Sequence, residues 1–267
     1  MANQPTAPNF APLPTAKNKK PRLPAVEYIR GISMLGVVGI HVGSIYMENP
    51  AANLYLAAGF EALTRFAVPI FFFISAFGLF YNLREDAFSY GAFLRRRFTA
   101  VLVPYIAWSV FYVIHDSYFY GVDPLPLEDF FHALVFGTTK YHLYFLVVLL
   151  WFYVLMPLFI PLVKRAGTKT LISLLVLQVA FDYWSSYSAG LSSFVYSLPD
   201  SLLKDFFVYR LNFWVLHYVF IFVLGGVLAR YDEMFLRRAK EKLPLLTAFF
   251  LVSAAVIVTH FFWLVKV

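Results

Sequence analysis

The chain lacks cysteine altogether and is poor in charged residues. None of its 267 residues is cysteine, which excludes disulfides, cysteine-ligated metal and acyl transfer through a cysteine thioester. Only 14% of the residues are charged, whereas a soluble domain carries roughly 25%. The chain also lacks the strict alternation of polar and apolar residues that is typical of strands crossing a bilayer. These absences exclude a soluble protein and a membrane-spanning sheet, and no metal site is predicted.

Long apolar runs are abundant, and hydrophobic residues make up 61% of the chain. About seven stretches of roughly 20 residues are apolar enough to cross a bilayer. The predicted fold is therefore all-α, a polytopic transmembrane helix bundle. Residues 1–24 are rich in Pro, Ala and Asn and are predicted to form a disordered cytoplasmic tail, followed by a transmembrane domain over 25–267. The apolar stretches lie near 26–47, 55–82, 98–119, 142–163, 170–188, 211–229 and 244–265.

The net charge of +7 is distributed between the apolar stretches, so membrane topology explains it and nucleic-acid binding is not predicted. The segments between the apolar stretches alternate between rich and poor in Lys and Arg. The segments on one side of the membrane hold sixteen of these residues, and those on the other side hold three, namely Lys140, Lys204 and Arg210. Because positive residues stay in the cytoplasm during insertion, this pattern predicts a cytoplasmic N-terminus. The predicted location is the plasma or inner membrane, with multiple passes.

The first apolar stretch, "VEYIRGISMLGVVGIHVGSIYM", contains three ionisable residues, Glu27, Arg30 and His41. Residues 11 apart on an α-helix differ by about 20° around the axis and by about 16 Å along it. Arg30 and His41 therefore share one face, and Glu27 lies one turn before Arg30. Ionisable groups inside a membrane usually mark a functional site. The alternative is a buried His bonded to a neighbouring helix, with Arg30 reaching the interface.

Four segments carry a family resemblance, and together they cover residues 26 to about 160. "EYIRGISMLGVVGIH" resembles the opening motif of the membrane acyltransferase-3 family, which has an Arg and a His separated by ten residues. "RFAVPIFFFISAFGLFYNL" resembles the second-helix motif and includes Arg65 and Ser75, although Ala76 stands where Gly is usual. "FLRRRFTAVLVPYIAW" resembles the basic third-helix motif, with Ala100 where a second Arg often stands. "KYHLYFLVVLLWFYVLMPLF" resembles the fourth, with His142 matching its His.

The resemblance implies an enzyme that moves an acyl group, commonly acetyl, from a cytoplasmic acyl-CoA to a sugar hydroxyl, often outside the membrane. It implies no tightly bound cofactor, with acetyl-CoA as co-substrate and a carbohydrate as acceptor. Members of the family typically have about ten helices, so the seven stretches are expected to represent a short version of that fold or a part of it.

The resemblance also suggests roles for residues on the donor side. We expect His41 to act as the general base that removes the hydroxyl proton, with a covalent acyl-His intermediate as a variant. Glu27 is expected to orient Arg30. Arginine forks bind phosphate well, so the coenzyme is expected to contact Arg30, the cluster Arg95, Arg96 and Arg97, and also Arg65 and Ser75. Each has an alternative explanation. Membrane topology alone would select a basic cluster on the cytoplasmic side. Arg65 could form an ion pair with Glu61, and the Ser75 hydroxyl could bond a backbone carbonyl.

On the acceptor side, His142 and Tyr141 begin the fourth helix at its outer end, and His115 and Asp116 end the third helix on that side. We expect these four residues to bind the acceptor, although Tyr141 also suits an interfacial aromatic belt. Asp182 and its aromatic neighbours suit carbohydrate as well, but only weakly. His217 and His260 have no charged partner at helical spacing and are predicted to be structural.

Two other classes of protein remain as alternatives. A transporter could use His41, Arg30 and Arg65 to move a proton or an anion, although no paired halves with broken helices are evident. Another lineage of membrane acyltransferases relies on a His with an Asn or Asp, and the Arg–His spacing argues against it.

Overall fold

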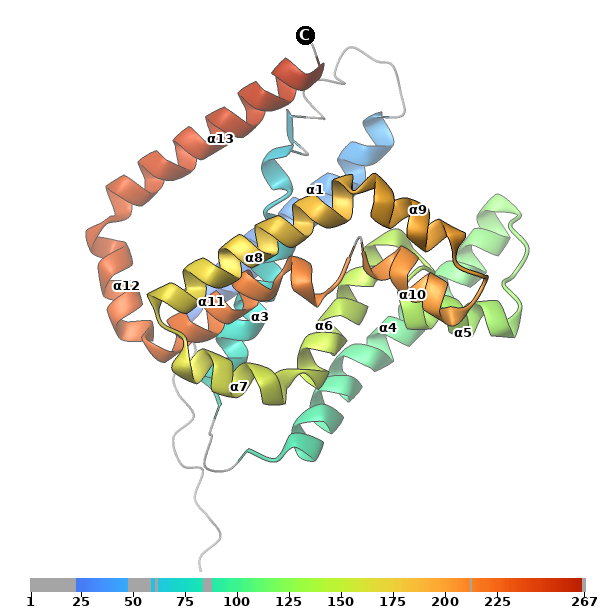
Figure 1. Cartoon of the computed structure of the whole chain (residues 1–267), viewed down its shortest axis with the longest axis horizontal. Coiled ribbons are helices and arrows are strands. Elements are labelled where there is room, and N and C mark those ends of the chain that lie inside the picture. Colours follow the sequence, from blue (N-terminus) through green and yellow to red (C-terminus); the bar gives the residue numbers. More distant parts are fainter. Residues whose placement is uncertain (1–22, 48–58, 61, 84–87, 212, 266–267) are drawn as a thin grey trace, which may run out of the picture.

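A computed structural model describes residues 23–47, 59–60, 62–83, 88–211 and 213–265. Within these ranges every regular element is a helix, which confirms the all-α prediction (Figure 1). The predicted tail lies almost entirely outside the described residues, and the first helix, α1, begins at Pro24 and ends at Met47.

Helices α1 and α3 (Ala67–Tyr81) pack against each other, and small residues allow them to approach closely. A Cβ added at Gly36 would lie 3.1 Å from Cβ of Ala67, and one at Gly39 would lie 2.4 Å from the ring of Phe60. Small residues at a helix crossing let backbones approach inside a membrane, where van der Waals packing drives association. This contact holds α1 at a defined depth against α3.

Helix α11 (Val219–Arg230) packs on the other side of α3 and forms the core with it. A Cβ at Gly225 would lie 2.4 Å from the carbonyl oxygen of Phe73, so the two backbones touch. The core is largely aromatic, and the rings of Phe152 and Phe222 stack with their centroids 4.1 Å apart. Aromatic pairs of this kind stabilise a core beyond the area they bury.

The middle of the chain forms a long helix followed by shorter ones. Helix α4 runs from Tyr90 to Tyr120 and contains Pro104. The hydroxyl of Tyr105 donates a 2.7 Å hydrogen bond to the carbonyl of Leu134, which ties α4 to α5. The shorter elements are α5 (Leu127–Phe136), η2 (Tyr141–Leu143), α6 (Tyr144–Val154) and α7 (Met156–Arg165).

The last third of the chain begins with α8 (Thr168–Tyr187) and continues through α9 (Ala189–Ser197), α10 (Leu202–Arg210) and η3 (Val215–His217) to α11. It ends with α12 (Asp232–Glu241) and α13 (Leu243–Val265). Helix α13 stands at the edge of the molecule, and most of its side chains are exposed (Figure 1).

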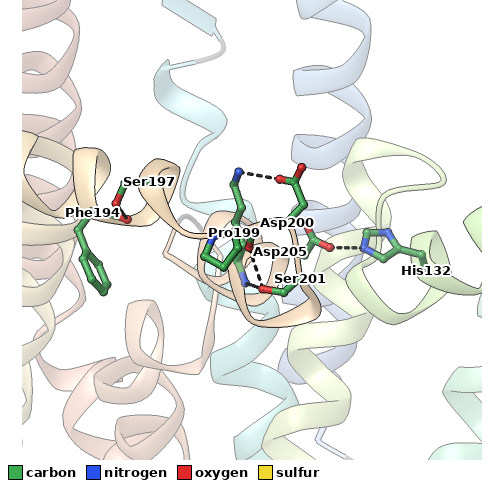
Figure 2. A network of polar contacts seen from close by, with 8 residues as sticks. His132, Phe194, Ser197, Pro199, Asp200, Ser201 and Asp205 are labelled. Carbon is green, nitrogen blue, oxygen red and sulfur yellow. Dashed lines mark hydrogen bonds and ion pairs between the residues drawn. The ribbon is translucent and has the colours of Figure 1, made fainter.

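A polar network joins α10 to α5 (Figure 2). His132 lies 2.9 Å from the carboxylate of Asp205, and the Ser201 hydroxyl accepts the main-chain N–H of Lys204 as an N-cap. The Lys204 ammonium donates to Asp200 at 2.8 Å, and this contact holds the pKa of the exposed Asp200 carboxyl below its usual value. The network fixes the short helices against the end of the bundle.

Within the described ranges, four helical segments are long and apolar enough to cross a membrane, or five if the bent pair of α5 with η2 and α6 counts as one span. The sequence suggested about seven. The predicted span 142–163 is interrupted between α6 and α7, and α1 and α8 are not among the segments that meet the length and composition criteria. The four segments are Ala62–Tyr81, Tyr90–Tyr120, Leu202–Arg230 and Leu243–His260.

The ends of the helices separate into two groups. Tyr81 at the end of α3, Val163 of α7 and Arg230 of α11 line one pocket, so the ends of these three helices meet. The last turns of α7 and α11 are basic. We call this the basic end. Because α1 and α3 pack along their lengths, the opposite end is where His41 lies, and we call it the His41 end.

Candidate active site

His41 contacts residues that lie a hundred positions later in the chain. Its Nδ1 hydrogen-bonds with the hydroxyl of Tyr141, and the two rings meet edge to face with centroids 4.9 Å apart. The ring of His142 lies 5.1 Å away on the same side. His41 is half-buried, so α1 presents it to η2 and to the start of α6. The structure thus places three of the predicted site residues together.

A second group of polar side chains extends this cluster along α4. The ring of Tyr112 lies 5.4 Å from that of His142, and the Lys140 ammonium lies 5.8 Å over the same Tyr112 ring. Lys140 also forms a 2.6 Å ion pair with Asp116, and Nδ1 of His115 lies 3.2 Å from the Asp116 carboxylate. His115 and Asp116 therefore join the His41 cluster through two residues that the sequence did not single out.

Lys140 and Tyr112 were missed for different reasons. Lys140 directly precedes Tyr141 and His142 in "KYH", so its proximity to the site could have been inferred, but it was assigned to topology alone. Tyr112 lies one turn before His115 and Asp116 on α4, and only the packing of α4 against η2 brings it between His142 and Lys140.

Arg30 lies at the basic end of α1. Its Nη1 lies 3.3 Å from the carboxylate of Glu27, so Glu27 contacts Arg30 as the helix spacing suggested. The guanidinium lies over α3, where a Cβ at Gly78 would be 3.5 Å from Nη2. Arg30, whose side chain is 45% exposed, thus reaches α3 from the side of α1 that carries His41, about 16 Å from His41 along the helix.

Of the three consecutive arginines on α4, only Arg97 faces the bundle. Its guanidinium lies 5.8 Å from the ring of Phe93 and 6.0 Å from that of Tyr153, within range of a cation–π interaction. Arg30 and Arg97 both act electrostatically on the Tyr153 phenol, which places them at the same end. Arg95 and Arg96 are exposed, and Nε of Arg96 donates to the carbonyl of Ala92 in its own helix.

Arg65 and Ser75 both precede Gly78, the α3 residue over which the Arg30 guanidinium lies. Arg65 sits in the turn before α3, next to Thr64, which packs against Gly36 of α1. Gly36 lies six residues after Arg30 and five before His41, so Arg65 lies at a depth between them, about 9 Å by rise from Arg30 and about 8 Å from His41. A contact of Arg65 with the coenzyme stays a prediction, and Glu61 lies outside the described residues.

Ser75 is half-buried in α3, one turn before Gly78. It lies between the two ends and on the same side of α3 as Gly78, because residues three apart are neighbours on a helix surface. The Ser75 side chain therefore lies between the depth of the Arg30 guanidinium and the depth of His41.

Two other features of the described ranges bear on the search for a site. An apolar groove of about 370 Å³ lies between α4, α5 and α6, and none of its lining residues is acidic or basic. The described part of the chain contains no group of three or more His, Asp or Glu that could hold a metal ion. The groove therefore supplies no charged side chain for binding or catalysis.

Comparison with known proteins identifies the chain at the level of a family. A family model described as an acyltransferase domain, of the acyltransferase-3 type, matches residues 23–265. The match extends beyond the four motifs, which end near residue 160, to α13. No curated protein and no solved structure matches the chain. Between the classes considered from the sequence, the match decides for an enzyme that transfers acyl groups.

Proposed function

The chain belongs to the acyltransferase-3 family, and on that premise we propose that it transfers acetyl from a cytoplasmic acyl-CoA to a hydroxyl of a surface or exported glycan. One observation carries the proposal. His41 shares the inward side of α1 with Arg30 and contacts Tyr141 and His142 at the opposite end. Such a base can meet a donor anchored at one end of the bundle and an acceptor at the other.

In the proposed reaction, His41 removes the proton of the acceptor hydroxyl. An imidazole titrates near neutral pH and is suited to this role. With the Tyr141 oxygen accepting the Nδ1 proton, Nε2 carries the lone pair that takes the proton. The hydroxyl oxygen attacks the thioester carbonyl, the carbon–sulfur bond breaks, and the coenzyme thiolate leaves and takes the proton from Nε2. The products are the acetyl ester and free coenzyme.

The proposed donor site is at the basic end. Coenzyme A carries phosphates, and guanidinium groups bind phosphate oxygens through paired N–H donors. Arg30 and Arg97 both lie near Tyr153, and Glu27 holds Arg30 in place. The pantetheine arm would extend from these arginines past Ser75 toward His41.

The proposed acceptor site is at the His41 end. His142, Tyr141, Lys140 and Asp116 offer hydrogen-bond donors and acceptors for sugar hydroxyls, and His115 holds Asp116. The test of the whole proposal is transfer of labelled acetyl from acetyl-CoA into envelope glycan extracted from the source cells. The purified protein is assayed in lipid vesicles. Correctly inserted protein that labels no glycan would contradict the proposal.

Arg97→Gln is expected to raise the KM for acetyl-CoA about tenfold, because one charge-assisted contact to phosphate is lost. The matched control is Arg95→Gln, two positions away on the exposed side of α4, which should leave the KM unchanged. Steady-state kinetics at saturating glycan measure both variants. An equal rise in the KM for acetyl-CoA in both variants would indicate that the positive charge of this surface attracts the coenzyme, and not that Arg97 contacts a phosphate.

Tyr141→Phe is expected to lower kcat about tenfold, because the hydrogen bond that orients the His41 ring is lost while the ring contact remains. The KM for acetyl-CoA should not change, since Tyr141 lies at the other end of α1. Tyr118→Phe, at an 81% exposed position, is the control. A rise in the glycan KM with unchanged kcat would assign Tyr141 to acceptor binding instead.

A further inference from the structure

A second polar cluster lies between α8 and η3, outside the site described above. It consists of Asp182 and Ser185 of α8, Trp214 before η3, and His217 of η3. Among the described residues, three buried side-chain polar atoms have no hydrogen-bond partner, and two of them belong to this cluster, Oδ1 of Asp182 and Nε1 of Trp214. Buried polar atoms are nearly always bonded, so these two atoms are available to the polar groups of a ligand, and the Asp182 side chain is 40% exposed and therefore accessible to one.

The hydrogen bonds of His217 define what the cluster can do. Its Nδ1 accepts the main-chain N–H of Trp214 at 3.1 Å, so the neutral ring carries its proton on Nε2. Nε2 lies 3.4 Å from Oγ of Ser185 and 4.0 Å from Oδ1 of Asp182. A Ser–His–Asp nucleophile needs the hydroxyl and the carboxylate on opposite ring nitrogens. Here both lie on the same nitrogen, so the cluster is suited to binding and not to nucleophilic attack.

The remaining groups suit a ligand that is rich in hydroxyls. Oδ1 of Asp182 can accept a hydrogen bond from a hydroxyl, while the indole N–H of Trp214 can donate to a hydroxyl oxygen. The Nε2 proton of His217 is already donated to Oγ of Ser185, so His217 borders the cluster without adding an open donor. Aromatic rings border the cluster, with Phe181 4.9 Å from the ring of His217 and Phe206 5.6 Å from that of Trp214. Small-molecule sites combine such apolar walls with a few convergent polar groups.

The cluster is continuous with the His41 end of the bundle. Tyr218 follows His217 and shares a hydrogen bond with Tyr144, and the Asp182 carboxylate acts electrostatically on the Tyr218 phenol. Tyr144 lies one helical turn after Tyr141, whose hydroxyl contacts His41. Asp182 is five residues from the end of α8, about 8 Å by rise, at the same end of the molecule.

We propose that Asp182, together with the indole N–H of Trp214, forms an acceptor subsite beside His217. It binds a second hydroxyl-bearing part of the glycan, separate from the hydroxyl that reacts at His41. This inference rests on the proposed function and extends it, because it names the groups that would select a glycan acceptor over a simple alcohol.

The test compares Asp182→Asn and Trp214→Phe with the unmodified protein in lipid vesicles. The concentration of extracted envelope glycan is varied, and labelled acetyl-CoA is saturating. Asp182→Asn keeps the side-chain shape and removes the carboxylate, and Trp214→Phe removes the indole N–H while keeping an aromatic ring. The KM for glycan should rise about tenfold in each variant while the KM for acetyl-CoA stays unchanged. Asp200→Asn, at a carboxylate whose side chain is 98% exposed, is the matched control and should change neither constant.

The outcomes separate this inference from the proposed function. If the unmodified protein shows no glycan labelling that depends on His41, the proposed function fails. If labelling is normal and Asp182→Asn and Trp214→Phe both leave the glycan KM unchanged, this inference alone fails. Should Asp182→Asn not fold, as judged by size-exclusion chromatography, Trp214→Phe decides. Ser185→Ala separates binding from nucleophilic catalysis, because its hydroxyl donates to the main-chain carbonyl of Asp182 and not to a base. A large loss of kcat with an unchanged glycan KM would overturn the inference in favour of a nucleophile.

Discussion

Replacing His41 with alanine is expected to abolish glycan acetylation, with a fall in kcat of about 10²- to 10⁴-fold, the usual contribution of a positioned general base. Without the imidazole, the acceptor hydroxyl keeps its proton and remains a weak nucleophile. The measurement is transfer of labelled acetyl from acetyl-CoA into extracted glycan, with the protein in lipid vesicles. The KM for acetyl-CoA should stay close to that of the unmodified protein, because the donor phosphates are expected to bind about 16 Å away, at Arg30.

His260→Ala is the matched control, since this imidazole lies on α13 and stacks on Trp263 away from the site. It should leave kcat unchanged. Size-exclusion chromatography and thermal unfolding of both variants show whether the fold is kept. Unchanged labelling with His41→Ala would end the assignment of the base and would turn attention to His142, whose ring lies 5.1 Å away.

Replacing Gly225 with alanine is expected to destabilise the fold strongly. The added Cβ would lie 2.4 Å from the carbonyl oxygen of Phe73 and 3.2 Å from Cβ of Ala76, so α11 and α3 would have to separate. Backbone atoms cannot rotate away as a flexible side chain can, and overpacking of this kind costs about 3 kcal/mol or more. The expected result is a large fall in the yield of folded protein and in the thermal unfolding midpoint.

Gly190→Ala provides the control, because a Cβ at this position in α9 has no atom within 4 Å. It should fold as well as the unmodified protein. Both variants are purified in the same detergent and followed by tryptophan fluorescence during heating. Equal unfolding midpoints for the two would show that α3 and α11 do not cross as closely as the structure has them.

The helical class and the inward face of α1 could be predicted because both depend on local properties. Apolar runs of about 20 residues indicate helices in a membrane, and the 11-residue spacing of Arg30 and His41 places them on one face of any α-helix. The contacts of His41 with Tyr141 and His142 depend on packing between distant segments, so spacing alone could not supply them. The order of the family motifs brought these residues to attention without showing how they meet.

The breaks in the helices could not be predicted from hydropathy, because the residues at the breaks are themselves apolar. Leu155 separates α6 from α7, where Pro157 stands in the first turn. Trp214 has an extended backbone, with φ −145° and ψ 175°, between α10 and α11. The contact of His217 with Asp182 could not be predicted for a different reason. Helical spacing within one segment does not reveal a residue on another helix, here α8. The depth of Arg65, beside Thr64 and opposite Gly36, likewise depends on how α3 packs against α1 and could not be read from spacing.

Because Arg30 and His41 are carried by the same rigid helix, the separation between them stays constant when α1 tilts or slides against α3. A donor held by its phosphates at Arg30 would present its thioester to His41 only if its arm has a matching reach. Under the proposed function, the length of α1 between Arg30 and His41 therefore selects the length of the coenzyme arm and not the acyl group. The size of the acyl group would then be selected by the residues around His41, near Tyr141.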